Sequence, residues 1–268
     1  MNIGHIRRIG LILWTLSAAC SAALALDRAD YDPYAVGNRW DYRFVLSVLC
    51  SMGEGEASRS GAFASAGKQV CEIVSEKERR SDGIVYLLRE TDTTTQDDLG
   101  EVPRVTTSES QDLISSKGHL TVAMRDVETG ESKWHEYDPP LRELPGDLSP
   151  GKEWSIGTSW RDTFTFKDDG KCVGTENVAV AAGEFDDCLK IVAVHGKVNG
   201  TFELDAGDKL PIKGGKGVLT YWLAKGVGVV KSEDVEQLIM EKTKDGKTET
   251  VTVTLKETME LLPGYKVK

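Results

Sequence analysis

Alternation of apolar and polar residues, repeated along most of the chain, is the feature that most constrains how this sequence can fold. Segment 40–50 shows it clearly, with Asp41, Arg43 and Ser47 between large apolar residues at every second position. Successive side chains of a β-strand point to opposite faces of a sheet, so this spacing predicts a strand with one buried face. No long stretch repeats at the i, i+3, i+4, i+7 spacing of an amphipathic helix.

Turn signals separate the strand patterns at intervals of about 8–12 residues. The predicted turns between strands are Ser81-Asp82-Gly83, Glu128-Thr129-Gly130, Asp168-Asp169-Gly170 and Lys244-Asp245-Gly246-Lys247. An Asp-Gly pair between two runs rich in β-branched and aromatic residues is typical of a hairpin. Two glycine-rich stretches, 51–67 and 213–217, are predicted to be loops.

The predicted fold class is all-β: a largely antiparallel meander, half-barrel or barrel-like sheet of about ten to twelve strands. A closed barrel, a half-barrel around a helix or loop, and a sandwich all fit the pattern. Residues 26–268 are predicted to form a single β domain. Segment 138–151 is the candidate internal break, because it holds four of the eight prolines and cannot be a continuous strand or helix. A surface crossing within one sheet is preferred over a boundary between two domains.

The first 25 residues predict where the protein works. Segment 1–25 has a basic start, an apolar stretch too short to span a bilayer, and small residues up to Ala25, as a signal peptide has. The mature chain is then exported and periplasmic or extracellular. In an alternative, Cys20 lies in a loose lipobox and is lipidated, which would anchor the chain at the outer membrane.

Charge and hydropathy limit the partners of the mature chain. The full sequence has a formal net charge of −10, and removal of Arg7 and Arg8 with the signal segment makes the mature chain still more acidic. This charge argues against nucleic acid or an anionic membrane surface, because both require clustered Lys and Arg. No second apolar run approaches the ~20 residues of a membrane span. The expected partners are a lipid or other hydrophobic ligand, or an envelope protein.

Four cysteines remain after the signal segment: Cys50, Cys71, Cys172 and Cys188. An even number in an oxidising compartment predicts two disulfides. Three pairings are possible, and the simplest joins sequence neighbours, Cys50 with Cys71 and Cys172 with Cys188. A metal site built from these cysteines is disfavoured, since the chain has no C-x-x-C spacing.

No residue is predicted to be catalytic, to bind a cofactor or to ligate a metal. The mature chain contains His119, His135 and His195, and none belongs to a compact metal-binding motif. Each is interpreted as structural, with His195 facing solvent or hydrogen-bonded at the end of an apolar strand. A hydrolase is the alternative, and it requires one histidine to meet a carboxylate or hydroxyl in a cleft.

Aromatic side chains supply the binding signal of this sequence. In a half-barrel, an apolar inner face could hold a hydrophobic ligand. The residues predicted to line such a cavity are Trp40, Tyr42, Phe44, Trp160, Phe164, Tyr221 and Trp222. The competing interpretation is that these side chains fill the core.

Three segments resemble a family of uncharacterised exported bacterial β proteins. Residues Tyr31–Tyr42 resemble its Y-x-P-x-x-x-G-N-x-W-x-Y opening, Ala182–Ile191 its A-G-x-F-x-x-C-L-K-I segment, and Tyr221–Lys231 its Y-W-x-A-x-G-V-G-x-V-K segment. The glycines of these motifs fit turns beside strands. The resemblance carries no catalytic residue, and it suggests a kinship with periplasmic lipoprotein-carrier-like half-barrels.

Together these features predict an exported envelope protein, most simply a non-enzymatic binding module for a hydrophobic ligand or an envelope component. A purely structural or protein-interaction module and a histidine-dependent hydrolase are the alternatives.

Overall fold

A computed structural model describes residues 31, 33–53, 59–97, 104–127, 133–146, 148–161, 164–203, 209–244 and 246–268. The predicted signal segment 1–25, its alternative lipidation site Cys20 and the predicted turn at 128–130 therefore lie outside the described residues.

The described residues form twelve antiparallel strands, which confirms the all-β prediction. They are β1 (Arg39–Met52), β2 (Arg59–Arg80), β3 (Gly83–Asp97), β4 (Arg104–Ser115), β5 (Gly118–Asp126), β6 (His135–Pro145), β7 (Glu153–Arg161), β8 (Phe164–Val180), β9 (Gly183–Glu203), β10 (Lys209–Ala224), β11 (Gly228–Lys244) and β12 (Lys247–Leu261). The part of the chain that the structure describes holds no helix long and apolar enough to cross a membrane.

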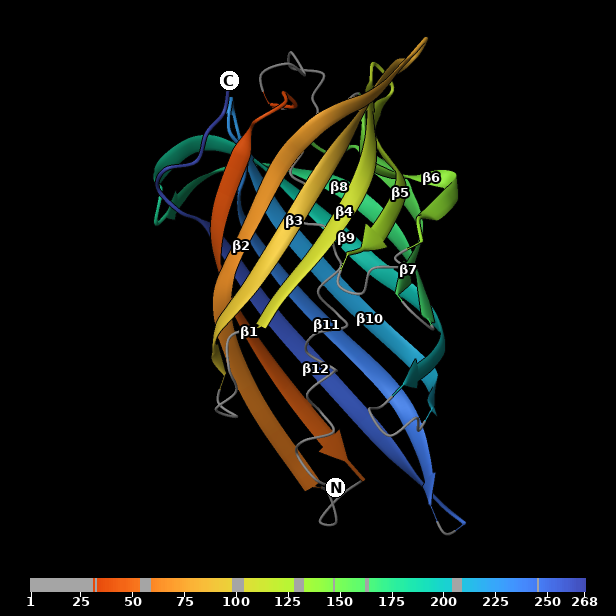
Figure 1. The fold of residues 1–268 in the computed structure, drawn as a ribbon. Coiled ribbons are helices and arrows are strands. Elements are labelled where there is room, and N and C mark those ends of the chain that lie inside the picture. The colour runs from red at the N-terminus through yellow and green to blue at the C-terminus, as the bar shows by residue number, and fades with distance from the viewer. Residues whose placement is uncertain are drawn as a thin grey trace.

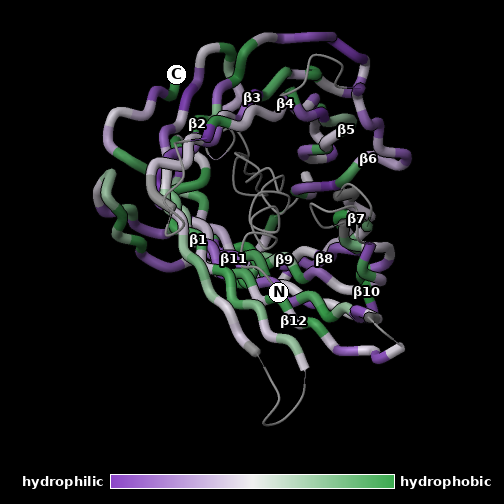
Figure 2. Tube along the Cα trace, turned by 60° about the horizontal axis from the view of Figure 1, so that its bottom comes forward, coloured by the Kyte–Doolittle hydropathy of each residue, from purple (hydrophilic) through white to green (hydrophobic). Residues whose placement is uncertain are grey.

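All twelve strands belong to one curled sheet (Figure 1), in the order β6-β5-β4-β3-β2-β1-β12-β11-β10-β9-β8-β7. Two six-stranded meanders, β1–β6 and β7–β12, are joined where β1 pairs with β12. Viewed from its lower end, the sheet bends around until its edge strands β6 and β7 approach one another (Figure 2). Trp154 Nε1 of β7 donates to Arg142 O of β6 at 3.1 Å. Strand pairing does not join these two edges in the described residues, so the sheet is not closed into a clean barrel.

The inner, concave face of the sheet carries the core. Along β1 the alternate residues from Trp40 to Met52 are buried on this face, while Val45 and Leu49 on the outer face are about half exposed. The buried apolar side chains form three clusters, and each draws on strands from both meanders. The period-2 pattern of segment 40–50 therefore predicted correctly which side of β1 is buried.

The sequence predicted a loop over the glycine-rich stretch 51–67, and this prediction is only partly correct. Residues from Arg59 onward form the first part of β2 and pair with β1. Gly67 lies opposite Phe44, and a Cβ at Gly67 would fall 2.4 Å from Phe44 Cζ. The small residues are thus required for packing under the aromatic ring, and tertiary pairing outweighs their weak strand propensity.

The other turn predictions have mixed outcomes. The turns at 81–83 and 244–247 are confirmed as the β2–β3 and β11–β12 connections, although Asp245 lies outside the described residues. The predicted turn at 168–170 is wrong because β8 passes through it, and the predicted loop at 213–217 is wrong because it lies within β10.

The proline-rich segment links the two edges of the sheet. Strand β6 runs through Pro139 and Pro140 to Pro145, which corrects the prediction that no continuous strand could form there. Proline is tolerated because β6 is an edge strand, where one side of the backbone needs no ladder partner. From Pro145 the chain crosses to β7 at the opposite edge of the same sheet.

The turn roles predicted for two glycine motifs are confirmed. Gly37 has a φ of 87° immediately before β1 begins at Arg39. Gly226 and Gly228, with φ of 70° and 95°, form the connection between β10 and β11. A side chain with a Cβ rarely adopts this backbone region, so glycine is needed at these turns.

The two predicted disulfides are absent: Cys50, Cys71, Cys172 and Cys188 are all free and buried. Cys50 lies opposite Gly61, ten positions from Cys71 on β2, a separation of about 33 Å at strand rise. Cys188 lies opposite Glu176, four positions from Cys172 on β8, or about 13 Å. A disulfide requires Cα atoms within about 7 Å, so register excludes both neighbour pairings.

Alkylation of the mature protein without reductant is expected to label four thiols in denaturant and to proceed far more slowly in the native state. Burial raises the pKa of the Cys50 and Cys172 thiols. Burial, reinforced by nearby acidic residues, raises the pKa of Cys188 to about 11. The reactive thiolate is therefore scarce at neutral pH. Intact mass spectrometry measures the number of labels, and a denatured chain that takes up none would contradict the free thiols.

Candidate functional site

A group of ionisable side chains interrupts the apolar inner face, and we call it the polar band. Its members are Asp92, Asp112, His119, Glu143, Asp168, His195, Asp234 and Glu236, contributed by strands β3, β4, β5, β6, β8, β9 and β11. Six acids and two histidines thus share the inner face of the sheet.

His195 of β9 is the centre of the first half of the polar band. Its Nδ1 lies 2.7 Å from Asp168 Oδ1, and Asp168 Oδ2 accepts a hydrogen bond from Ser159 Oγ at 2.8 Å. The imidazole Nε2 lies 3.7 Å from Glu236 Oε1. Only 2% of each of these three ionisable residues is exposed. Asp168 therefore orients the ring, with Nδ1–H as donor, and directs Nε2 towards β11.

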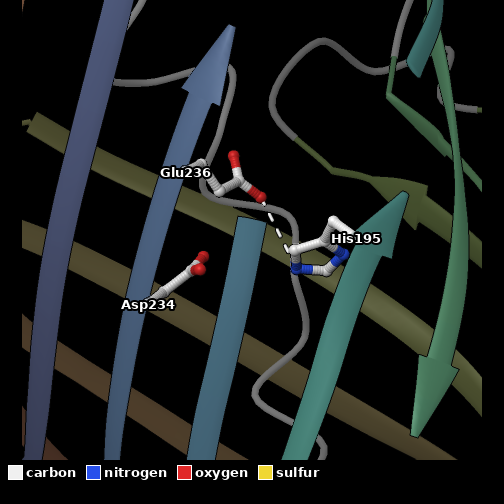
Figure 3. Close-up of side chains that lie close together, drawn as sticks. All are labelled: His195, Asp234 and Glu236. Carbon is white, nitrogen blue, oxygen red and sulfur yellow. Dashed lines mark ion pairs between the residues drawn. The ribbon is translucent and has the colours of Figure 1, made fainter. Parts of the chain in front are cut away.

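Asp234 completes this group from β11. Asp234 and Glu236 occupy alternate positions of one strand, so both face His195 across β10 (Figure 3). One ligand atom each from His195, Asp234 and Glu236 lies within 4.8 Å of the others. Asp234 is only partly buried, whereas its two neighbours are buried.

Gly217 of β10 allows the two side chains to meet. It pairs with His195 on one side and with Glu236 on the other. A Cβ at this position would lie 2.7 Å from His195 Cδ2 and 2.9 Å from Glu236 Cγ. The imidazole and the carboxylate therefore lie over the bare backbone of the intervening strand, which explains a glycine in the middle of β10.

The second half of the polar band surrounds Asp112 of β4. Tyr34 Oη and Ser110 Oγ each donate to Asp112 Oδ2 at 3.0 Å. Thr121 Oγ1 lies 3.0 Å from Asp112 Oδ1, and His119 Nε2 lies 3.5 Å from the same oxygen. Asp112 is therefore a buried carboxylate held by three hydroxyl groups and a histidine, as burial of a charge requires.

Glu143 of β6 connects the two halves. Thr121 Oγ1 lies 3.3 Å from Glu143 Oε1. Burial raises the pKa of Glu143 to about 7, with the nearby charges of Asp112 and Asp168 raising it further and His119 opposing them. Because Asp112 and Asp168 belong to different halves and both act on Glu143, the polar band is one electrostatic unit.

The carboxyl group of Asp92 on β3 also has a raised pKa. Burial raises the pKa of Asp92 to about 7, although a hydrogen bond with Gln69 opposes the rise. Two carboxyl groups of the polar band thus hold their protons up to nearly neutral pH.

Most of the aromatic residues predicted to line a cavity pack within the core. Trp40 Nε1 donates to Val227 O at 2.6 Å, and Tyr42 Oη donates to Val229 O at 3.0 Å. Phe164 stacks edge-on against Phe166 with ring centroids 5.2 Å apart. Phe44 and Tyr221 are also buried in apolar clusters. The side chain of Trp160 lies outside the described residues.

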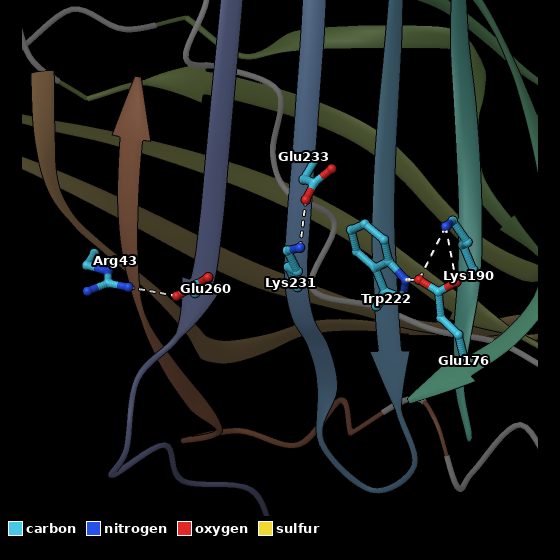
Figure 4. A network of polar contacts seen from close by, with 7 residues as sticks. All are labelled: Arg43, Glu176, Lys190, Trp222, Lys231, Glu233 and Glu260. Carbon is cyan, nitrogen blue, oxygen red and sulfur yellow. Dashed lines mark hydrogen bonds and ion pairs between the residues drawn. The ribbon is translucent and has the colours of Figure 1, made fainter. Parts of the chain in front are cut away.

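Trp222 is buried, only 5% exposed, and belongs to the same apolar cluster as Trp40, but it lies on the face of β10 opposite to Tyr221. The two residues are successive on β10 and must point to opposite faces. Trp222 Nε1 donates to Glu176 Oε1, and Lys190 Nζ and Lys231 Nζ lie 5.1 and 4.9 Å from the centre of its ring. Figure 4 shows this cation–π arrangement on the face that also carries the Arg43–Glu260 pair.

The three histidines have different environments. His135 is exposed on β6, whereas His119 and His195 are buried beside carboxylates. A serine hydrolase needs the imidazole next to the nucleophilic hydroxyl. Here Ser159 contacts Asp168, and His195 Nε2 faces Glu236, so the described residues around His195 lack that arrangement.

The sequence had pointed to none of the acidic residues of the polar band. Asp168 was assigned to a turn because Asp-Gly favours one. One signal was present: Asp168 follows Phe164 and Phe166 on the same face of β8, and Asp234 and Glu236 precede Leu238 on the same face of β11. Acids at the inward positions of an otherwise apolar strand indicate a buried polar site.

Comparisons with known proteins add no functional assignment. No protein-family model and no curated protein matches the chain. Among solved structures, a DUF1329 family protein from Desulfovibrio piger ATCC 29098 is 9% identical, and the alignment covers 84% of this chain and 87% of that one with a TM-score of 0.15. A likeness at this TM-score carries no argument about fold or function.

Proposed function

We propose that this chain is an exported envelope protein that acts as a non-enzymatic binding module, with the polar band as the binding site for a positively charged group. The observation that carries the proposal is the group of buried carboxylates that surround His119 and His195 on the inner face. Burial raises the pKa of Asp92 and of Glu143 to about 7, so neither carboxyl group ionises readily there. A bound cation would allow these groups to ionise and would stabilise them together.

Apolar clusters on the same inner face suggest the remainder of the ligand. Buried residues such as Ile191, Ala193 and Tyr221 lie on the neighbouring inward positions of β9 and β10. A ligand with a cationic group and an apolar portion therefore fits the inner face better than a purely hydrophobic one. The signal-like segment 1–25 and the resemblance to exported β proteins support an envelope location.

Native mass spectrometry of the protein purified from its own envelope tests this function. We expect the wild-type chain to carry a bound mass, and an Asp112→Asn, Asp168→Asn double variant to lose it while remaining folded by circular dichroism. Glu260→Gln is the matched control, because Glu260 pairs with Arg43 on the outer face. Wild-type protein without a bound mass, or a double variant that retains it, would contradict the proposed site.

A row of exposed valines favours a protein-interaction module as the second candidate. Val194, Val218 and Val235 are directly opposite one another across β9, β10 and β11, and each is more than 40% exposed on the outer face. Adjacent apolar side chains of this kind are typical of contact surfaces. The same native mass measurement distinguishes the candidates, since a protein partner would be lost in Val218→Lys and retained in the inner-face double variant.

A further inference from the structure

We propose that His195, Asp234 and Glu236 form a binding site for a divalent transition-metal ion, with zinc as the best-matched ion. The inference rests on the proposed function, because the metal ion would be the positively charged group that binds in the polar band. It also goes further, since it names the ligand atoms: His195 Nε2 and one carboxylate oxygen each from Asp234 and Glu236.

The distances suit a small first-row ion. Ligand atoms about 2.0–2.1 Å from a tetrahedral zinc ion lie about 3.3 Å from one another. His195 Nε2 and Glu236 Oε1 are already 3.7 Å apart, and the three candidate atoms lie within 4.8 Å of one another.

The surroundings of His195 match those of metal-binding histidines. Such a histidine donates its second ring N–H to a carboxylate, which fixes the tautomer and raises the basicity of the ligating nitrogen. Asp168 Oδ1 accepts from Nδ1 at 2.7 Å, and Ser159 holds the other carboxylate oxygen of Asp168. Asp168 is thus a positioning residue that leaves Nε2 directed at Glu236.

Charge and donor type select the class of ion. Two carboxylates balance the charge of a divalent cation, and an imidazole nitrogen with carboxylate oxygens is a common zinc ligand set. Three protein ligands leave a coordination position for water or for a donor atom of a bound molecule. Asp234 is partly exposed, whereas His195 and Glu236 are buried.

The same geometry has one competing explanation, a protonated His195 that bridges Asp168 and Glu236 as an ion pair. An imidazolium would neutralise part of the carboxylate charge and would bind no metal. The two explanations therefore differ in a direct measurement of metal binding.

Isothermal titration of the metal-stripped full protein with zinc chloride tests the site. We expect one zinc ion per chain, and at least tenfold weaker binding in His195→Gln and in Asp234→Asn. His135→Gln is the matched control, because His135 is an exposed histidine outside the polar band. Asp234→Asn is the variant least disturbing to the fold, since Asp234 is only partly buried. Titration with cobalt chloride would add the visible absorption of a tetrahedral site.

Wild-type protein that binds neither zinc nor cobalt, or variants that bind zinc as tightly as wild type, would overturn the metal site. A native organic adduct in a chain that binds no zinc would overturn the metal site alone and leave the proposed function intact. If the chain binds zinc but carries no bound organic mass when purified from its envelope, the metal site would be supported. The proposed ligand with a cationic and an apolar portion would then be overturned.

Discussion

Replacement of Gly217 by valine is expected to lower the free energy of unfolding by about 3 kcal/mol and to separate His195 from Glu236. The new Cβ would lie 2.7 Å from the imidazole and 2.9 Å from the Glu236 side chain, closer than real Cβ contacts permit. Both side chains would have to leave their buried positions, and the favourable electrostatic interaction between the imidazole and the carboxylate would be lost. Equilibrium denaturation with urea measures the effect.

Gly214 supplies the matched control for this substitution. It lies on the same strand three residues earlier, and a Cβ there would meet no atom within 4 Å. Valine has a higher strand propensity than glycine, so Gly214→Val is expected to be neutral or slightly stabilising. Equal destabilisation by the two variants would show that the effect comes from β10 itself and would contradict the role of Gly217 in assembling the polar band.

The protein is expected to lose stability as the pH rises from about 5 to 7, because Glu143 holds its proton in the folded state. The pKa of Glu143 rises from its usual 4.5 to about 7 on folding. Between these values the unfolded chain has released the proton and the folded chain has kept it, so a higher pH favours unfolding. The contribution of Glu143 across this range is about 3 kcal/mol.

Glu143→Gln isolates this contribution, because glutamine keeps the shape of the neutral carboxyl group and does not titrate. The difference in unfolding free energy between wild type and Glu143→Gln is expected to fall from pH 5 to pH 7 and then level off. Asp112, His119 and Asp168 face Glu143 from β4, β5 and β8 and are unchanged in both proteins. Glu136→Gln, at an exposed position of β6, is the control. A difference independent of pH would contradict a buried, protonated Glu143.

Glu109 behaves in the opposite sense and in a different range of pH. Hydrogen bonds from Arg125 and Arg89 outweigh the effect of burial and lower the pKa of Glu109. The stability that this carboxylate contributes is therefore present above its unfolded pKa of about 4.5 and is lost as the pH falls through its lower folded value. Glu109 therefore does not cause the loss of stability expected between pH 5 and 7, which we assign to Glu143 on the inner face.

The sequence predicted the strands better than the connections. Alternation from Trp40 to Cys50 gave β1 within two residues at each end, because burial of one face controls the pattern. Glycine misled the prediction at 51–67 and at 213–217. Gly67 leaves room for the side chain of Phe44, and Gly217 leaves room for those of His195 and Glu236. These side chains lie on neighbouring strands, so the local sequence carries no signal of the contacts.

By itself, the sequence determined the fold class and the inward face of strands such as β1, since a period of two residues follows from the geometry of a single strand. Only the tertiary structure decided the strand order and register, and with them the polar band. Asp168, His195 and Glu236 come from three strands, and Gly217 of a fourth lies between the last two. Alternation shows which way a side chain points but not which strand lies beside it. The contacts of the buried acids were therefore invisible until the sheet was assembled.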